Sequence, residues 1–153
     1  MAKQPAQKQR PDFSGIATKA NVKCKDGRII LPKAFAHNDG RRVPLVWQHG
    51  HNEVTNVLGH GILSYQSNGD VRLDGYFNRS ESGQHAKMAV QDGNIDSMSI
   101  WANELREVDL KVTHGDIKEV SLVLAGKNPG AKIDYISFEH GDSDELSSDE
   151  AIL

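Results

Sequence analysis

The chain has 153 residues, of which 37% are hydrophobic and 25% are charged, and its formal net charge is −3. This length and composition are typical of one soluble globular domain and exclude a collagen-like or membrane-embedded protein. The single cysteine, Cys24, excludes an internal disulfide and a zinc site built from several cysteines.

Charge is concentrated at the two ends of the chain. Residues 1–11 carry basic and no acidic side chains, whereas residues 140–153 carry acidic and no basic ones. Both segments have too few apolar residues to offset the entropy lost on ordering, so we expect them to be flexible. The predicted folded domain therefore spans residues 12–139. Its nearly balanced charge, without a basic stripe, argues against nucleic-acid binding.

No apolar run is long enough for a membrane span and no secretory signal is visible, so a cytoplasmic setting is expected.

Strand patterns dominate the first half of this domain. Short apolar or alternating runs predict strands at residues 13–20, 28–32, 43–47, 59–66 and 71–78. The clearest signal is the pair Asn68-Gly69 between the last two runs, because both residue types tolerate the positive φ of a hairpin turn.

One helix is predicted, over residues 81–92. Ser80 or Ser82 can cap its start, alanine, methionine and valine side chains supply an apolar stripe, and Gly93 can end it. Strand patterns return afterwards at residues 97–110, 116–126 and 131–139. These elements predict a strand-rich α+β domain, a partly closed β-barrel with one principal helix.

Three residues are candidates for catalysis. His49 follows a predicted buried strand and can act as a general base near neutral pH. Ser99 shares a predicted strand face with Ser97, and a serine becomes a nucleophile when a base removes its proton. Glu119 can accept the second ring N–H of a histidine, as the acid of a catalytic triad does. The alternative reading gives these residues no chemistry: a loop histidine, an ordinary strand serine and a solvent-facing carboxylate.

A histidine cluster suggests a different chemistry. His49 and His51, with His60 nearby, have a spacing that can bind zinc. No cysteine or strong carboxylate partner lies close to them in sequence, and a chain with seven histidines brings some together by chance. We therefore expect neither a metal nor another cofactor.

The order of these segments resembles the tailed-phage prohead proteases, a family related in fold to the herpesvirus assemblins. The resemblance covers about residues 12–134 and rests on three segments: VPLVWQH, QDGNIDSMSI after the helix, and KEVSLVLAGKNPGAKI. It implies an assemblin-type barrel and a serine protease. In that protease His49 is the base, Ser99 the nucleophile and Glu119 the acid that orients the histidine.

The sequence also departs from the family pattern. Ser97 and Trp101 stand where relatives have glycines around the nucleophile, so Trp101 either narrows the site or packs in the core. The loop Gly126–Gly130 is a candidate for the oxyanion hole, because glycines let backbone N–H groups approach a ligand closely.

The resemblance further implies what the protein acts on. Its substrates are the scaffold protein or the scaffolding segment of the major capsid protein, and the protease itself, cleaved inside an assembling procapsid in the host cytoplasm. Assemblin relatives act as dimers, so a homodimer is implied as well. Two alternatives stay open: a catalytically inactive scaffold- or capsid-binding protein on the same fold, and a histidine-ligated metal hydrolase.

Overall fold

The computed structural model describes residues 9–138. The predictions of a flexible basic head and a flexible acidic tail therefore fall almost entirely outside the described residues. The described strands are β1 (Phe13–Thr18), β2 (Ile29–Ile30), β3 (Arg42–Trp47), β4 (Val57–Tyr65), β5 (Val71–Phe77), β6 (Ser97–Val108), β7 (Lys111–Val123) and β8 (Ile133–Ile136). The helices are the 3-10 turns η1 (Ala36–Asn38) and η2 (Val54–Asn56) and the α-helix α1 (Glu81–Gln91).

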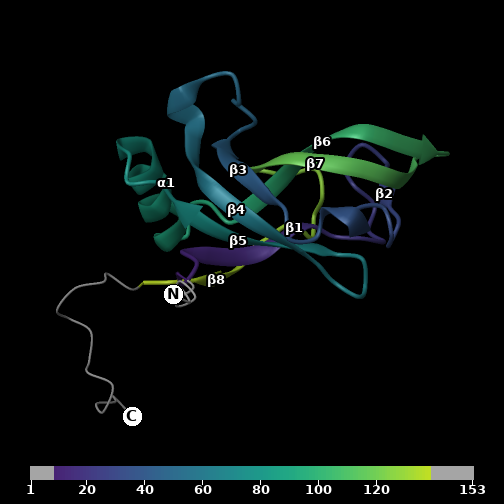
Figure 1. Ribbon diagram of the computed structural model, residues 1–153, viewed down its shortest axis with the longest axis horizontal. Coiled ribbons are helices and arrows are strands. Elements are labelled where there is room, and N and C mark those ends of the chain that lie inside the picture. The colour runs from purple at the N-terminus through teal and green to yellow at the C-terminus, as the bar shows by residue number, and fades with distance from the viewer. Residues whose placement is uncertain (1–8, 139–153) are drawn as a thin grey trace, which may run out of the picture.

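All eight strands belong to one mixed sheet (Figure 1). Its order is β2-β7-β3-β4-β5-β1-β8, and β6 pairs with β7 beside this path. Strand β7 runs parallel to β2 and β3 and antiparallel to β6. The single α-helix of the described residues, α1, packs against β4 and β5. The predicted α+β class is confirmed.

The prediction of a partly closed barrel is not confirmed, because the described sheet is not closed into a barrel. The strands at the two ends of the path, β2 and β8, do not pair with each other. Only an isolated bridge, Ser97–Lys132, links β6 to the segment before β8. A fully closed barrel would need a continuous ladder at this point, and the structure has the single bridge instead.

Local signals predicted the helix and one hairpin well. The Ser80 hydroxyl accepts a hydrogen bond from the Gly83 N–H (3.1 Å), as an N-cap should, and Gly93 follows the helix with φ of +78°. In the β4–β5 hairpin only Gly69 has a positive φ, +96°. Asn68 contributes differently, since its side-chain oxygen accepts the Asp70 N–H (3.0 Å).

The β6–β7 hairpin differs from the prediction. The two strands are joined at Asp109 and Leu110, the last two residues of the predicted strand 97–110. Both residues have positive φ, +51° and +65°, although neither is glycine or asparagine. The turn therefore carries no sequence signal of the usual kind. Figure 1 shows this long hairpin extending away from the rest of the sheet.

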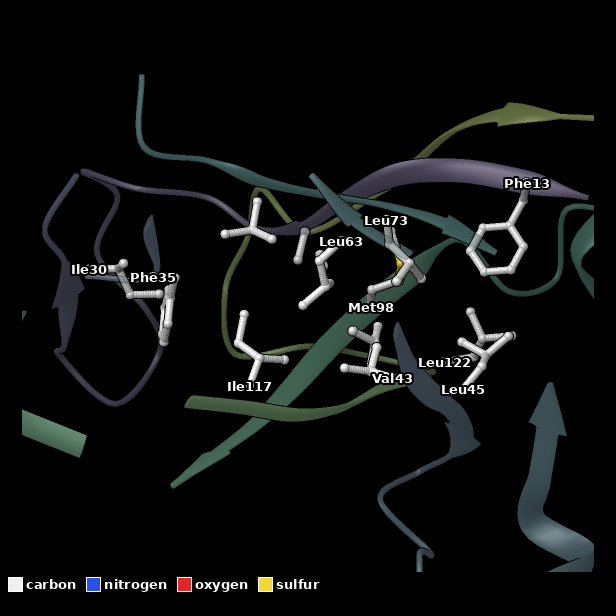
Figure 2. Packing of buried hydrophobic residues seen from close by; sticks show 14 of the residues in the cluster. Phe13, Ile30, Phe35, Val43, Leu45, Leu63, Leu73, Met98, Ile117 and Leu122 are labelled. Atoms are coloured by element: carbon white, nitrogen blue, oxygen red, sulfur yellow. The ribbon is translucent and has the colours of Figure 1, made fainter. Parts of the chain in front are cut away.

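The hydrophobic core joins the strands that carry the candidate residues. Buried side chains from most strands meet in it, among them Phe13, Leu45, Leu63, Leu73, Met98, Ile117 and Leu122 (Figure 2). Leu45, Met98 and Leu122 lie on β3, β6 and β7 and are fully buried. Packing of this kind fixes the three strands relative to one another. No helix within residues 9–138 is long and apolar enough to cross a membrane.

Candidate active site

Strand β7 is the centre of the site, because its two neighbours bring the other residues to it. Ser121 of β7 lies opposite Ser99 of β6 in the antiparallel register. On its other side, Ser121 is next to Val46 of β3 in the parallel register. Residues directly opposite each other on antiparallel strands share a face of the sheet, so Ser99 and Ser121 point the same way. His49 lies just after the end of β3, on the opposite side of β7 from Ser99, and its side chain reaches the same face of the sheet.

An unusual backbone turns His49 toward β7. Gln48 and His49 both have positive φ, +50° and +58°, a region that non-glycine residues rarely adopt. The Gln48 N–H donates to the Leu122 carbonyl (3.0 Å), and the His49 N–H donates to the Ser121 hydroxyl (2.9 Å). Such residues cost about 1–3 kcal/mol each and persist where their surroundings hold them. The backbone strain of this turn thus lies at the candidate base.

The His49 ring lies between Ser99 and Glu119. Its Nε2 is 2.9 Å from Ser99 Oγ, and its Nδ1 is 2.8 Å from Glu119 Oε1. A carboxylate only accepts hydrogen bonds, so Nδ1 carries the proton and Nε2 can accept the Ser99 hydroxyl proton. This is the arrangement that nucleophilic acyl transfer by a serine–histidine–acid triad requires. The structure brings all three candidate residues together.

The strand pattern alone favours a solvent-facing Glu119, but in the structure the Glu119 side chain is buried. Its side chain is 1% exposed, and the neighbouring Ser121 is fully buried. The Ser121 hydroxyl donates to Glu119 Oε1 (3.2 Å) while it accepts the His49 N–H. A buried carboxylate is costly unless it is paired and hydrogen-bonded, and His49 and Ser121 supply these contacts to Oε1. Ser121 is thus a site residue that the sequence analysis did not identify.

A second histidine faces the other carboxylate oxygen. His51 Nδ1 lies 3.0 Å from Glu119 Oε2, at ion-pair distance. Within the described residues Oε2 has no partner aligned for a hydrogen bond, so this contact is mainly electrostatic. The His51 ring stacks on Trp101, with centroids 4.5 Å apart and planes at 13°. Trp101 is partly exposed and lies opposite Glu119 in the β6–β7 register, so it borders the site and supports His51.

Ser97 and Ser99 share a strand but have different partners. The buried Ser97 hydroxyl donates to Asp96 (2.8 Å) and accepts from the Lys132 ammonium (2.9 Å). These contacts place it in a separate polar cluster. Ser99 instead contacts His49 and borders a cavity. The geometry therefore distinguishes two serines that strand alternation treats as equivalent.

A cavity of about 400 Å³ lies beside Ser99 and His49. Gly126 and Lys127, from the loop after β7, line it. Gly126 is so close to β6 that a Cβ there would lie 2.8 Å from the Met98 carbonyl oxygen. The absence of a side chain therefore lets this loop pass next to the strand segment that holds Ser99. Gly130, at the other end of the candidate oxyanion loop, packs against Lys19 instead.

The three histidines considered as a zinc site do not converge. His49 and His51 face Glu119, whereas His60 stacks on Tyr76 with centroids 5.0 Å apart. Burial lowers the pKa of His60, with Arg42 as a second cause. Within residues 9–138, the ligand atoms that could hold a metal ion are instead those of His37, His114 and Asp116, which lie within 4.8 Å of one another.

No protein-family model matches the chain, and no curated protein matches it either.

Proposed function

We propose that the protein is a serine endopeptidase of the prohead-protease type, with an assemblin-type fold. It cleaves scaffold protein or the scaffolding segment of the major capsid protein, and itself, inside a procapsid assembling in the host cytoplasm. The observation that carries this proposal is the His49 ring, whose two nitrogens contact Ser99 Oγ at 2.9 Å and Glu119 Oε1 at 2.8 Å. Substrate identity rests on the sequence resemblance, and the reaction type rests on this geometry.

Each residue of the triad has a distinct role in the proposed reaction. Ser99 Oγ attacks the scissile carbonyl carbon as its proton passes to His49 Nε2. The imidazolium then gives that proton to the leaving amine, and the substrate's acyl group stays on Ser99. Water, deprotonated by the same histidine, hydrolyses this ester. Glu119 fixes the Nδ1–H tautomer throughout and stabilises the positive charge that develops on the ring.

The negative oxygen that forms during the attack needs fixed N–H donors. The loop at Gly126 and Lys127 borders the cavity beside Ser99, and this position favours it as a source of backbone donors. Removal of a single oxyanion donor costs about 3–4 kcal/mol of transition-state stabilisation in a well-studied protease.

Ser99→Ala tests the proposal, with Ser97→Ala as the matched control from the same strand. Each variant and the wild type is incubated with the candidate scaffold protein, and cleavage is followed by gel and mass spectrometry. We expect the wild type and Ser97→Ala to cleave and Ser99→Ala to be inactive. A fluorophosphonate probe, which reacts with activated serines, should label the first two proteins only. Binding of scaffold without cleavage or labelling by any of the three would favour the inactive binding protein.

A further inference from the structure

We propose that the cavity beside Ser99 is a specificity pocket for a large, uncharged apolar side chain of the substrate. The side chain would flank the peptide bond that is cleaved. This inference rests on the proposed function, because it concerns which peptides present their scissile bond to Ser99.

The walls of the cavity are mainly apolar. Its volume, about 400 Å³, falls in the range of small-ligand pockets, about 300–1,000 Å³. Six of the apolar side chains in the lining come from β2, from the residue before η1, and from β6 and β7: Ile30, Phe35, Ile100, Trp101, Leu105 and Val112. An apolar substrate side chain in this space loses contact with water and gains contact with these walls, which favours binding.

Gly115 of β7 shapes one wall. A Cβ at Gly115 would lie 2.7 Å from Phe35 Cε1 and 3.3 Å from Leu105 Cδ2. Because Gly115 has no side chain, Phe35 and Leu105 can both pack directly against β7 at this position. Leu105 and Ser99 both lie on β6, so the cavity follows this strand away from the nucleophile.

The charged groups of the lining are ion-paired or exposed to water, so none of them is a buried partner for a charged substrate side chain. Arg28 contacts Asp26 at 3.2 Å and Glu107 at 3.3 Å, so its charge is shared between two carboxylates. Lys127 is exposed, so water solvates it. Burial of a charged side chain without a partner costs its hydration. The cavity should therefore exclude acidic and basic side chains as well as accept apolar ones.

The test is a cleavage-site profile. Wild-type protein is incubated with a peptide library derived from a denatured proteome, and the new termini are identified by mass spectrometry. We expect leucine, isoleucine, methionine or phenylalanine to be enriched at one position next to the cleaved bond. Aspartate, glutamate, lysine and arginine should be depleted there.

Two substitutions on the same hairpin then link the preference to the cavity. Leu105→Asp adds a carboxylate to the wall and should lower kcat/KM for the preferred apolar peptide by at least about tenfold. Val108→Asp is the control, because Val108 is exposed on the same strand and does not line the cavity. It should cleave like the wild type. If circular dichroism shows that Leu105→Asp is unfolded, Leu105→Ala replaces it, with a weaker apolar preference as the expected result.

Fluorophosphonate labelling separates failure of this inference from failure of the proposed function. A wild-type protein that is labelled and cleaves peptides without an apolar preference would overturn the pocket assignment and leave the protease function intact. The pocket assignment would also be wrong if Leu105→Asp and Val108→Asp had equal profiles. A wild-type protein that is neither labelled nor able to cleave peptides would contradict the protease function itself.

Discussion

Strand β7 carries two histidine–carboxylate clusters of similar composition, and the contrast between them defines the candidate active site. Glu119 contacts His49 and His51, and Asp116 contacts His37, whose ring stacks on His114 with centroids 4.5 Å apart. The Glu119 side chain is 1% exposed, whereas that of Asp116 is 26% exposed. Only the first cluster, called here the Glu119 cluster, has a serine hydroxyl on its histidine and borders the cavity.

The second cluster, called the Asp116 cluster, lies where η1 is hydrogen-bonded to β7. His37 lies in η1, and the next residue, Asn38, is fully buried. The Asn38 side chain donates to the Gly115 carbonyl and accepts the Ile117 N–H, each at 3.0 Å, so it ties η1 to β7 around Asp116. Histidines and carboxylates occur in both clusters, so the nucleophile, the burial and the access to a cavity are what distinguish the candidate catalytic cluster.

His49→Ala should have the largest effect. Loss of the base leaves no group to take the Ser99 proton, and removal of a triad histidine or serine in a well-studied protease lowers kcat by about 10⁶-fold. His114→Ala, the matched change in the Asp116 cluster, should leave kcat/KM unchanged for the same peptide. Wild-type activity should also fall on acidification, because an imidazolium cannot accept the serine proton. Activity that a chelator abolishes and zinc restores would instead support a metal hydrolase.

Glu119→Gln should have the next largest effect. Glutamine keeps the shape of the side chain but lacks the charge that stabilises the imidazolium and its tautomer. The corresponding acid-to-amide change in a well-studied serine protease lowers kcat by about 10⁴-fold. Asp116→Asn is the control and should keep the wild-type kcat. Wild-type cleavage by Glu119→Gln would show that the acid of the triad lies elsewhere.

His51→Gln should have a moderate effect, because His51 acts through Glu119 and touches no reacting atom. Loss of its contact with Oε2 leaves the carboxylate less firmly held, and small misplacements of catalytic groups cost up to about 10²-fold in rate. We expect kcat to fall by about 10–100-fold at nearly constant KM, with a changed pH profile of kcat. Trp101→Phe preserves an aromatic surface under His51 and should stay closer to the wild type. A KM effect alone would indicate that His51 contacts substrate instead.

The sequence predicts the local elements better than their assembly. The helix begins at its Ser80 cap and ends before Gly93, because caps act on the residues next to them. Closure of the sheet depends on pairing between segments far apart in the chain, and alternation patterns contain no information about such pairing. The sequence does not predict the Asp109-Leu110 turn, because Leu110 stands where such turns usually have glycine and leucine rarely adopts a positive φ.

In the candidate site, too, the sequence predicts individual residues better than the contacts between them. Residue type and position make His49, Ser99 and Glu119 candidates, and the resemblance gives each one its role, whereas strand alternation alone leaves Ser97 equivalent to Ser99. The role of Ser121 depends on the parallel register between β3 and β7, which places the His49 N–H at its hydroxyl. The contact between His51 and Glu119 depends in turn on the strained turn that ends β3. Such register and loop geometry is set by tertiary packing and has no local sequence pattern.

Asp116→Asn should have the smallest effect, and on stability only. The hydrogen bond from His37 is the main cause that lowers the pKa of Asp116 in the folded protein. A lowered folded-state pKa means that the ionised carboxylate stabilises the fold above the unfolded-state pKa of about 3.9. This stabilisation disappears as the pH falls through the lower folded-state value. Urea unfolding at pH 7 should therefore show the variant slightly less stable than the wild type, since the pair is partly exposed and screened by solvent. At a pH below the folded-state pKa the two proteins should unfold at similar urea concentrations. A stability difference that persists at that acidic pH, or a loss of cleavage activity at pH 7, would contradict the purely structural role of this cluster.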